Sequence, residues 1–226
     1  MLHHAFSRQR FLQLLAAGLM LGSTLPRTAL AAGSAGTVAR VKGTVSLRRG
    51  GQQSTVSEGD AVEVGDVVTT LAESRLRIAL ADGSVINLGE LTRLTIAEFA
   101  FARETLTREA LLDLDSGLLQ AITAKAGSGS SFVVRTGNAV AATRSTDWIV
   151  EAKKAETTVV VQEGKVDVME SALGFRSLPS AGEDKALLLS AGQSTTIGKI
   201  ALGGQLGPQM ADGAKLEKYL AGLAMD

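Results

Sequence analysis

The chain has 226 residues, with 23 basic and 23 acidic side chains, two histidines and no cysteine. This length suits one domain with small appendages, and an apolar content of 45% is enough for a packed core, which excludes a chain that is disordered throughout. Aromatic residues make up only 4% and glycine is frequent, at 25 residues, so we expect a chain that turns often and packs with aliphatic side chains.

The first 31 residues have the features of a secretory signal peptide. They hold three arginines, both histidines and no acid, and residues 11–26 form an uncharged segment. This segment is shorter than the roughly 20 residues of a membrane-spanning helix, and Ala29, Leu30 and Ala31 make a small-x-small cleavage site. We therefore expect residues 1–31 to be removed after Ala31, leaving a periplasmic or otherwise secreted protein. An uncleaved membrane anchor is the alternative.

The chain after residue 31 excludes several kinds of chemistry. It carries 20 basic and 23 acidic side chains, because the first 31 residues hold three arginines and no acid, and this net charge of −3 disfavours nucleic-acid binding. Without histidine or cysteine it has no Ser–His or Cys nucleophile, no disulfide, and no zinc, copper or haem site built on those ligands. Carboxylate chemistry and oxygen-ligated calcium or magnesium remain compatible with the sequence.

Residues 32–36 are predicted to be a tether of small residues, and residues 37–200 a β domain. Apolar and polar residues alternate along many short segments, which are separated by glycine and aspartate pairs. This pattern predicts an all-β fold of many short strands, most simply a compact β-sandwich or β-roll, with a barrel as a third arrangement. Residues 157–161 are β-branched throughout and predict a strand that is buried on both faces.

Three segments interrupt the β pattern. Residues 98–108 mix charge with two phenylalanines and predict a long hairpin or projecting loop, residues 125–131 form a Gly/Ser connection, and residues 171–185 form a surface excursion. We take 98–108 and 171–185 as the candidate contact regions.

Residues 201–226 form a C-terminal extension. Asp212 can cap a short helix that runs from Gly213 to about Ala224 and carries its apolar residues on one side. Packing on the β domain is the expected role of this helix, and binding of a partner is the alternative.

No short motif rises to a catalytic, cofactor-binding or metal-binding site. Asp113, Asp115 and Gly117 have the first spacings of a calcium loop, but the further oxygen ligands and the closing glutamate are missing. The triplet from Asp115 to Gly117 resembles that of aspartic proteases, which need two such acids, and no second triplet exists. We therefore expect a strand that runs into a turn. Trp148, beside Asp147, fits a core position better than a ligand groove.

The order of turns and strands resembles the FecR domain family. Over about residues 36–200 the resemblance is carried by residues 58–60, 64–70, 80–84, 114–119, 132–136, 138–142, 159–166 and 188–193. One departure is Ser145, which stands where the family has glycine in an Arg-Gly-Thr motif, and it predicts a turn that does not require a positive φ.

The resemblance implies an extracytoplasmic sensing or interaction module. The regulators that name the family also carry a sigma-binding domain and a membrane helix, and neither is expected here, so no direct anti-sigma activity is carried over. We expect a non-enzymatic exported module without a cofactor that binds an envelope or membrane protein, or an envelope ligand, in signalling or scaffolding. The alternative function is a carboxylate-based hydrolase of envelope polysaccharide or peptide, which requires a cleft with two suitably spaced acids.

Overall fold

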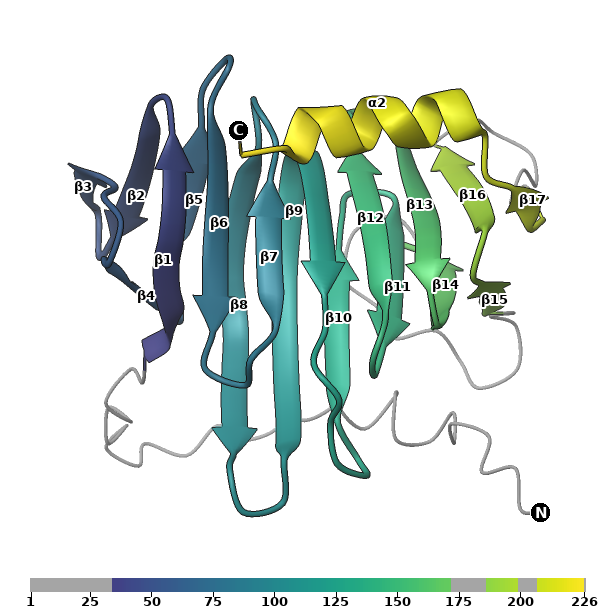
Figure 1. Ribbon diagram of the computed structural model, residues 1–226, viewed down its shortest axis with the longest axis horizontal. Coiled ribbons are helices and arrows are strands. Elements are labelled where there is room, and N and C mark those ends of the chain that lie inside the picture. Colours follow the sequence, from purple (N-terminus) through teal and green to yellow (C-terminus); the bar gives the residue numbers. More distant parts are fainter. Residues whose placement is uncertain (1–33, 172–185, 199–206, 226) are drawn as a thin grey trace, which may run out of the picture.

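The computed structural model describes residues 34–171, 186–198 and 207–225, and over these ranges the chain is mostly β-structure with one helix (Figure 1). The strands form two facing layers, sheet A and sheet B, that are joined through one shared strand. The expected all-β fold of sandwich or β-roll type is therefore confirmed.

Over the described residues, sheet A has the strand order β4 (Ala61–Glu63), β1 (Ser34–Lys42), β6 (Arg75–Leu80), β7 (Val85–Leu88), β9 (Thr107–Ile122), β12 (Asp147–Ala152), β13 (Glu156–Glu163), β16 (Gln193–Gly198) and β17 (Gln209–Met210). Sheet B has the order β3 (Gln52–Thr55), β2 (Val45–Arg49), β5 (Val67–Thr70), β8 (Arg93–Ala102), β9, β10 (Ser131–Arg135), β11 (Ala139–Thr143), β14 (Lys165–Glu170) and β15 (Leu187–Ser190). Among these pairs only β9 and β10 run parallel.

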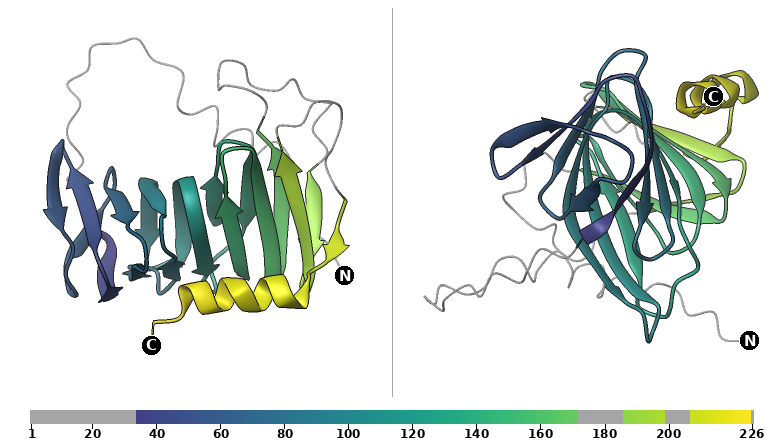
Figure 2. Two further views of the ribbon diagram at one scale, coloured as in Figure 1. Left: turned by 90° about the horizontal axis from the view of Figure 1, so that it is seen from above. Right: turned by 60° about the vertical axis from the view of Figure 1, so that its left-hand side comes forward.

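The chain lays down hairpins on alternate sheets, which gives the molecule the form of a flattened roll (Figure 2). After β9, the hairpin β10–β11 lies in sheet B, β12–β13 in sheet A, β14–β15 in sheet B and β16–β17 in sheet A. Because side chains alternate along a strand, each strand turns one face toward the opposite sheet, and this explains the period-two pattern of the sequence.

The strand β9 belongs to both sheets. Residues 107–116 pair with β8 in sheet B, and residues 117–122 pair with β7 and β12 in sheet A. The crossing occurs at Gly117, whose φ is +99° and where a Cβ would lie 2.3 Å from Oγ1 of Thr92. Residues 116 and 117 are therefore a bend inside a continuous strand, and the expectation of a turn at the end of a strand is wrong.

One apolar core fills the space between the sheets. It is aliphatic apart from a few rings, of which Phe132 and Trp148 are fully buried, so the core interpretation of Trp148 is confirmed. All five residues from 157 to 161 are buried as well, as the β-branched run predicts.

The predicted hairpin at residues 98–108 is present, because β8 and β9 pair up to Ala102 and Thr107 and extend beyond the neighbouring strands (Figure 1). The Gly/Ser connection after β9 is bonded to this hairpin. Gly127 donates its backbone N–H to the carbonyl of Leu106 at 2.8 Å, and Oγ of Ser130 accepts the backbone N–H of Arg108 at 3.1 Å.

The helix α2 (Gly213–Leu223) lies on the outer face of sheet A (Figure 2). The carboxylate of Asp212 accepts the backbone N–H of Ala214 at 3.0 Å, so the predicted N-cap and the predicted helix are both confirmed. Tyr219 and Leu223 are buried against Ile149 and Val160, and Oη of Tyr219 donates to the carboxylate of Glu151 at 2.8 Å. Of the described residues, none forms a helix with the length and apolarity needed to cross a membrane.

Several predicted boundaries fall at or beyond the limits of the described residues. The predicted signal peptide and residues 172–185 of one predicted contact region lie outside them. The strand β1 begins at Ser34, so part of the predicted 32–36 tether is already strand.

Candidate interaction surfaces

The recurring glycine and aspartate pairs of the sequence are built into the scaffold. The carboxylate of Asp66 is fully buried and accepts two hydrogen bonds from Arg49, both at 2.7 Å, and one from the backbone N–H of Glu63 at 2.8 Å. The carboxylate of Asp60 accepts the backbone N–H of Ser57 at 2.8 Å. Both acids hold turns, and the buried Asp66 also holds Arg49 in place.

A buried arginine joins the hairpin to the body of the roll. Arg108 is fully buried and its Nη1 donates to Asp82 at 2.5 Å and to Oγ of Ser84 at 2.9 Å. Its Nη2 donates to the carbonyl of Arg144 at 2.6 Å, and its guanidinium lies over the ring of Phe132 at 5.2 Å. Asp82, in the Asp82–Gly83–Ser84 turn that belongs to the FecR resemblance, is therefore the acid of a buried ion pair.

The predictions from the sequence do not include a role for Arg108. A signal was present, because Arg108 has the same strand parity as Ala110, Leu112 and Leu114, all of which are buried. A charged residue on an apolar stripe predicts a buried ion pair when a partner acid is available.

The segment from Arg144 to Thr146 connects β11 of sheet B to β12 of sheet A. Oγ1 of Thr146 donates to the carbonyl of Lys165 at 3.1 Å, and its backbone N–H is bonded to Oγ1 of Thr123 at 2.6 Å. Among the described non-glycine residues only Glu73, Leu91 and Leu106 have a positive φ. Ser145 is not one of them, so the predicted variant turn is confirmed.

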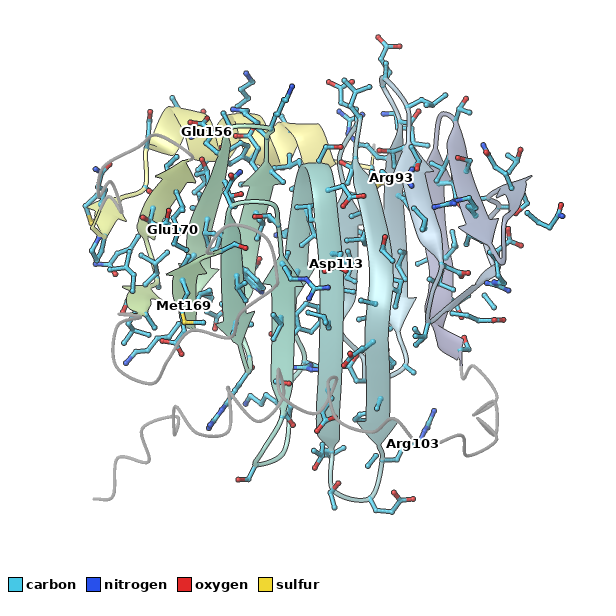
Figure 3. All side chains as sticks on the ribbon, turned by 180° about the vertical axis from the view of Figure 1, so that it is seen from behind. Arg93, Arg103, Asp113, Glu156, Met169 and Glu170 are labelled. Atoms are coloured by element: carbon cyan, nitrogen blue, oxygen red, sulfur yellow. The ribbon has the colours of Figure 1, made fainter. Side chains whose placement is uncertain are left out.

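The acids of the predicted calcium-like spacing are neutralised by arginines. Asp113 accepts two hydrogen bonds from Arg135, at 2.5 and 2.7 Å, and Asp115 accepts one from Arg93 at 3.1 Å; Figure 3 labels Asp113 and Arg93 on this side of the molecule. Among the described residues no three His, Asp or Glu side chains are grouped so that they could hold a metal ion.

Burial raises the pKa of two acids, Asp147 and Asp167, and these acids lie on different sheets. Asp147 is in β12 of sheet A, where it accepts a hydrogen bond from Nε2 of Gln120 at 2.9 Å. Asp167 is in β14 of sheet B. Because both side chains have the outward parity of their strands, they point away from each other and do not form the acid pair of a glycosidase.

Asp147 gives a testable pH dependence. Its carboxyl has a raised pKa in the folded state, above the ordinary value of 3.8, because burial and the nearby Glu163 disfavour the charge. The folded state therefore holds this proton more tightly, and the contribution to stability is greatest below pH 3.8 and falls as pH rises through the folded pKa. We expect Asp147→Asn to be more stable than wild type at pH 7, with the difference vanishing near pH 3.

The measurement is the free energy of unfolding in urea at several pH values, with Asp115→Asn as the control at an exposed acid. The control is expected to change stability by less than about 1 kcal/mol at pH 7. A stability difference for Asp147→Asn that stays constant across the pH range contradicts the assignment.

The edge strand β3 is an accessible backbone edge of sheet B. All four of its residues are exposed, and among the described residues it pairs only with β2. Val56 donates its N–H to the carbonyl of Val45 at 3.0 Å. Because bonded residues alternate in an antiparallel pair, the N–H and C=O groups of Gln53 and Thr55 point to the free side. The strand has no charge, no proline and no bulge, which are the usual means of protecting an edge.

The facing edge of sheet A, formed by β4, is less accessible to another chain, because Arg49 of sheet B is bonded to it. Nη2 of Arg49 reaches across and donates to the carbonyl of Ala61 in β4 at 2.9 Å, while its Nη1 is paired with Glu63 at 2.8 Å. A shallow groove between the two edges is lined by Leu47, Arg49, Gln52, Ser54, Thr55, Asp60 and Ala61. At this end of the roll, therefore, the edge available to another chain is that of β3.

The hairpin tip is a second exposed feature. Residues 102–106 are exposed, and Leu106 is 53% exposed with a φ of 54°. Arg103 is labelled at this tip in Figure 3. Of the two predicted contact regions, the hairpin at 98–108 is the one that the described residues include.

Comparisons with known proteins agree with the sequence resemblance. The profile of the family described as FecR protein matches residues 66–167. Two crystal structures of a candidate anti-sigma factor from Parabacteroides distasonis ATCC 8503, at 1.65 and 2.50 Å resolution, are similar to this chain at 19% sequence identity, with TM-scores of 0.52 and 0.51. The similarity covers 69% of this chain and 65% or 64% of those chains, so this chain spans less than two thirds of their length and shares their fold. A search of curated proteins found no match.

Proposed function

We propose that this chain, which carries a FecR-family domain at residues 66–167, is an exported, non-enzymatic module that binds a protein partner in envelope signalling. The family match supports the signalling role, as does the fold shared with a candidate anti-sigma factor. The signal-like residues 1–31 support a periplasmic or secreted location. The arginine-bound and scaffold roles of Asp66, Asp82 and Asp113 favour binding over carboxylate catalysis.

The open edge of β3 carries the proposal. An extended segment of a partner can add to sheet B there and take up the outward N–H and C=O groups of Gln53 and Thr55. The residues of β3 are neutral, so the affinity for an extended chain comes from main-chain hydrogen bonds. The alternate side chains of the strand supply the specificity. The hairpin at 98–108 is a second candidate contact on the same module.

The test uses Gln53→Pro, which removes one outward donor. The N–H of Gln53 makes no bond to β2, so the fold is expected to be retained, with the free energy of unfolding within about 1 kcal/mol of wild type. Tagged, exported protein is crosslinked in intact cells and purified, and the captured proteins are identified by mass spectrometry. We expect wild type and the control Gln53→Thr to capture the same envelope protein, and Gln53→Pro to lose at least nine tenths of it.

Hydrogen exchange of the purified complex locates the contact independently. Backbone amides of β3 are expected to gain protection when the captured partner is added. Equal capture by Gln53→Pro and wild type contradicts the role of the edge, and capture of no specific protein by wild type contradicts the proposed function itself.

A further inference from the structure

Two exposed leucines lie side by side on loops at the side of the molecule opposite the hairpin tip. Leu71 follows β5 and is 51% exposed, and Leu91 precedes β8 and is 62% exposed. The N–H of Leu91 donates to the carbonyl of Leu71 at 3.3 Å, so the loops that carry them are in direct contact. These loops rise along the upper edge of the molecule in Figure 1, beside the end of α2. Adjacent exposed leucines at one site are a feature of binding surfaces.

The backbone presents Leu91 in an unfavourable conformation. Its φ is 52°, in the left-handed region that favours glycine. The surrounding structure enforces this conformation, because the buried Oγ1 of Thr70 donates to the carbonyl of Gly89 at 2.6 Å and accepts the N–H of Thr92 at 2.9 Å. A strained and exposed apolar side chain in a rigidly held loop indicates a functional position.

Two carboxylates lie beside the two leucines. The carboxylate of Glu90 accepts the backbone N–H of Glu73 at 2.8 Å, which ties the two loops together, and both glutamates are exposed. Two arginines begin the adjoining strands, but Arg75 donates to the carbonyls of α2, at 2.8 and 3.2 Å, and Arg93 is paired with Asp115. Both arginines are therefore engaged by other groups of the protein, and the two exposed carboxylates are available to basic groups of an approaching chain.

We propose that this leucine patch, made of Leu71, Glu73, Glu90 and Leu91, binds a short segment of a partner protein in which apolar side chains stand next to lysine or arginine. The apolar side chains cover the two leucines, and the basic groups lie against the two carboxylates. Since Leu91 is fixed before binding, the segment binds without the cost of ordering this loop. The patch is separate from the β3 edge, and the proposal does not depend on the use of that edge.

The test compares two leucine-to-glycine variants. Random 15-residue peptides displayed on phage are selected on the wild-type protein, and the affinities of the enriched peptides are measured by fluorescence anisotropy. We expect the enriched peptides to share apolar residues next to lysine or arginine. They should bind Leu91→Gly at least tenfold more weakly than wild type, and raising NaCl from 50 to 500 mM should weaken their binding to wild type.

The variant Leu91→Gly is expected to fold well, because glycine suits a φ of 52° and the leucine side chain is mostly exposed. Its melting temperature should equal or exceed that of wild type, so a loss of binding cannot be attributed to unfolding. Leu188→Gly is the control, since Leu188 is also exposed, at 49%, but lies in β15 of sheet B, outside the leucine patch, the β3 edge and the hairpin. This control should bind the enriched peptides within twofold of wild type.

Three results overturn the proposal. The first is enriched peptides that bind Leu91→Gly as tightly as wild type, and the second is the absence of enrichment or of basic residues in the enriched set. The third is self-association of wild type that Leu91→Gly abolishes, because this result assigns the patch to a second copy of the chain. The Gln53→Pro variant is expected to bind the peptides like wild type, which separates this test from that of the β3 edge.

Discussion

Replacing Arg108 with methionine is expected to lower the free energy of unfolding by about 3–5 kcal/mol, because the substitution leaves the carboxylate of Asp82 buried and without its cation. The methionine fills much of the same space over Phe132, so the loss reports the missing charge and hydrogen bonds more than a cavity. The groups that lose their donor include Oγ of Ser84 and the carbonyl of Arg144. The measurement is equilibrium unfolding in urea.

The exposed pair Arg93 and Asp115 supplies the matched control. Arg93→Met removes the same kind of cation from an acid, but both side chains are largely in water, so the expected loss is below about 1 kcal/mol. The double variant Arg108→Met with Asp82→Asn should recover part of the loss, since it removes the orphaned charge. A loss for Arg108→Met no larger than that of Arg93→Met contradicts the role of the buried pair.

Gly117→Ala is expected to destabilise the protein by about 3 kcal/mol or more. The new Cβ would lie 2.3 Å from Oγ1 and 2.4 Å from Cα of Thr92, and because one of these atoms is backbone, the clash cannot be relieved by rotating a side chain. The φ of +99° adds a conformational cost for any residue with a Cβ. Thermal unfolding and urea unfolding should both show the loss.

Gly129→Ala separates these two causes. Gly129 also has a positive φ, of +87°, but a Cβ at this position would meet no atom within 4 Å, so only the conformational cost of about 1–2 kcal/mol is expected. If the two variants lose equal stability, then close packing at the crossing of β9 is not what requires glycine at position 117.

The features that the sequence predicted are those encoded by neighbouring residues. The β-branched run at 157–161, the capped helix after Asp212 and the hairpin around residues 98–108 each depend on patterns within a dozen residues. The crossing of β9 was not predicted, because it depends on which distant strands pair with each half of the strand. A glycine that permits a bend looks the same in a sequence as a glycine that ends a strand.

The candidate site was less predictable than the fold. Breaks in the β pattern predict contact regions at residues 98–108 and 171–185, which include the hairpin but neither the β3 edge nor the leucine patch. The open edge of β3 follows from its position as the outermost strand, which is a property of the strand order. The exposure of Leu91 follows from a left-handed φ that two buried threonines impose, and nothing in its neighbouring residues signals that conformation.

The shared strand β9 also determines how the molecule unfolds. Its first part is bonded to β8 and β10, and its second part to β7 and β12, so it is held by four ladders that involve strands before and after it in the chain. Opening either half of the roll exposes one side of β9 and weakens the ladders of the other half. We therefore expect the two halves to unfold as one cooperative unit, in a single transition, with the slowest amide exchange along β9.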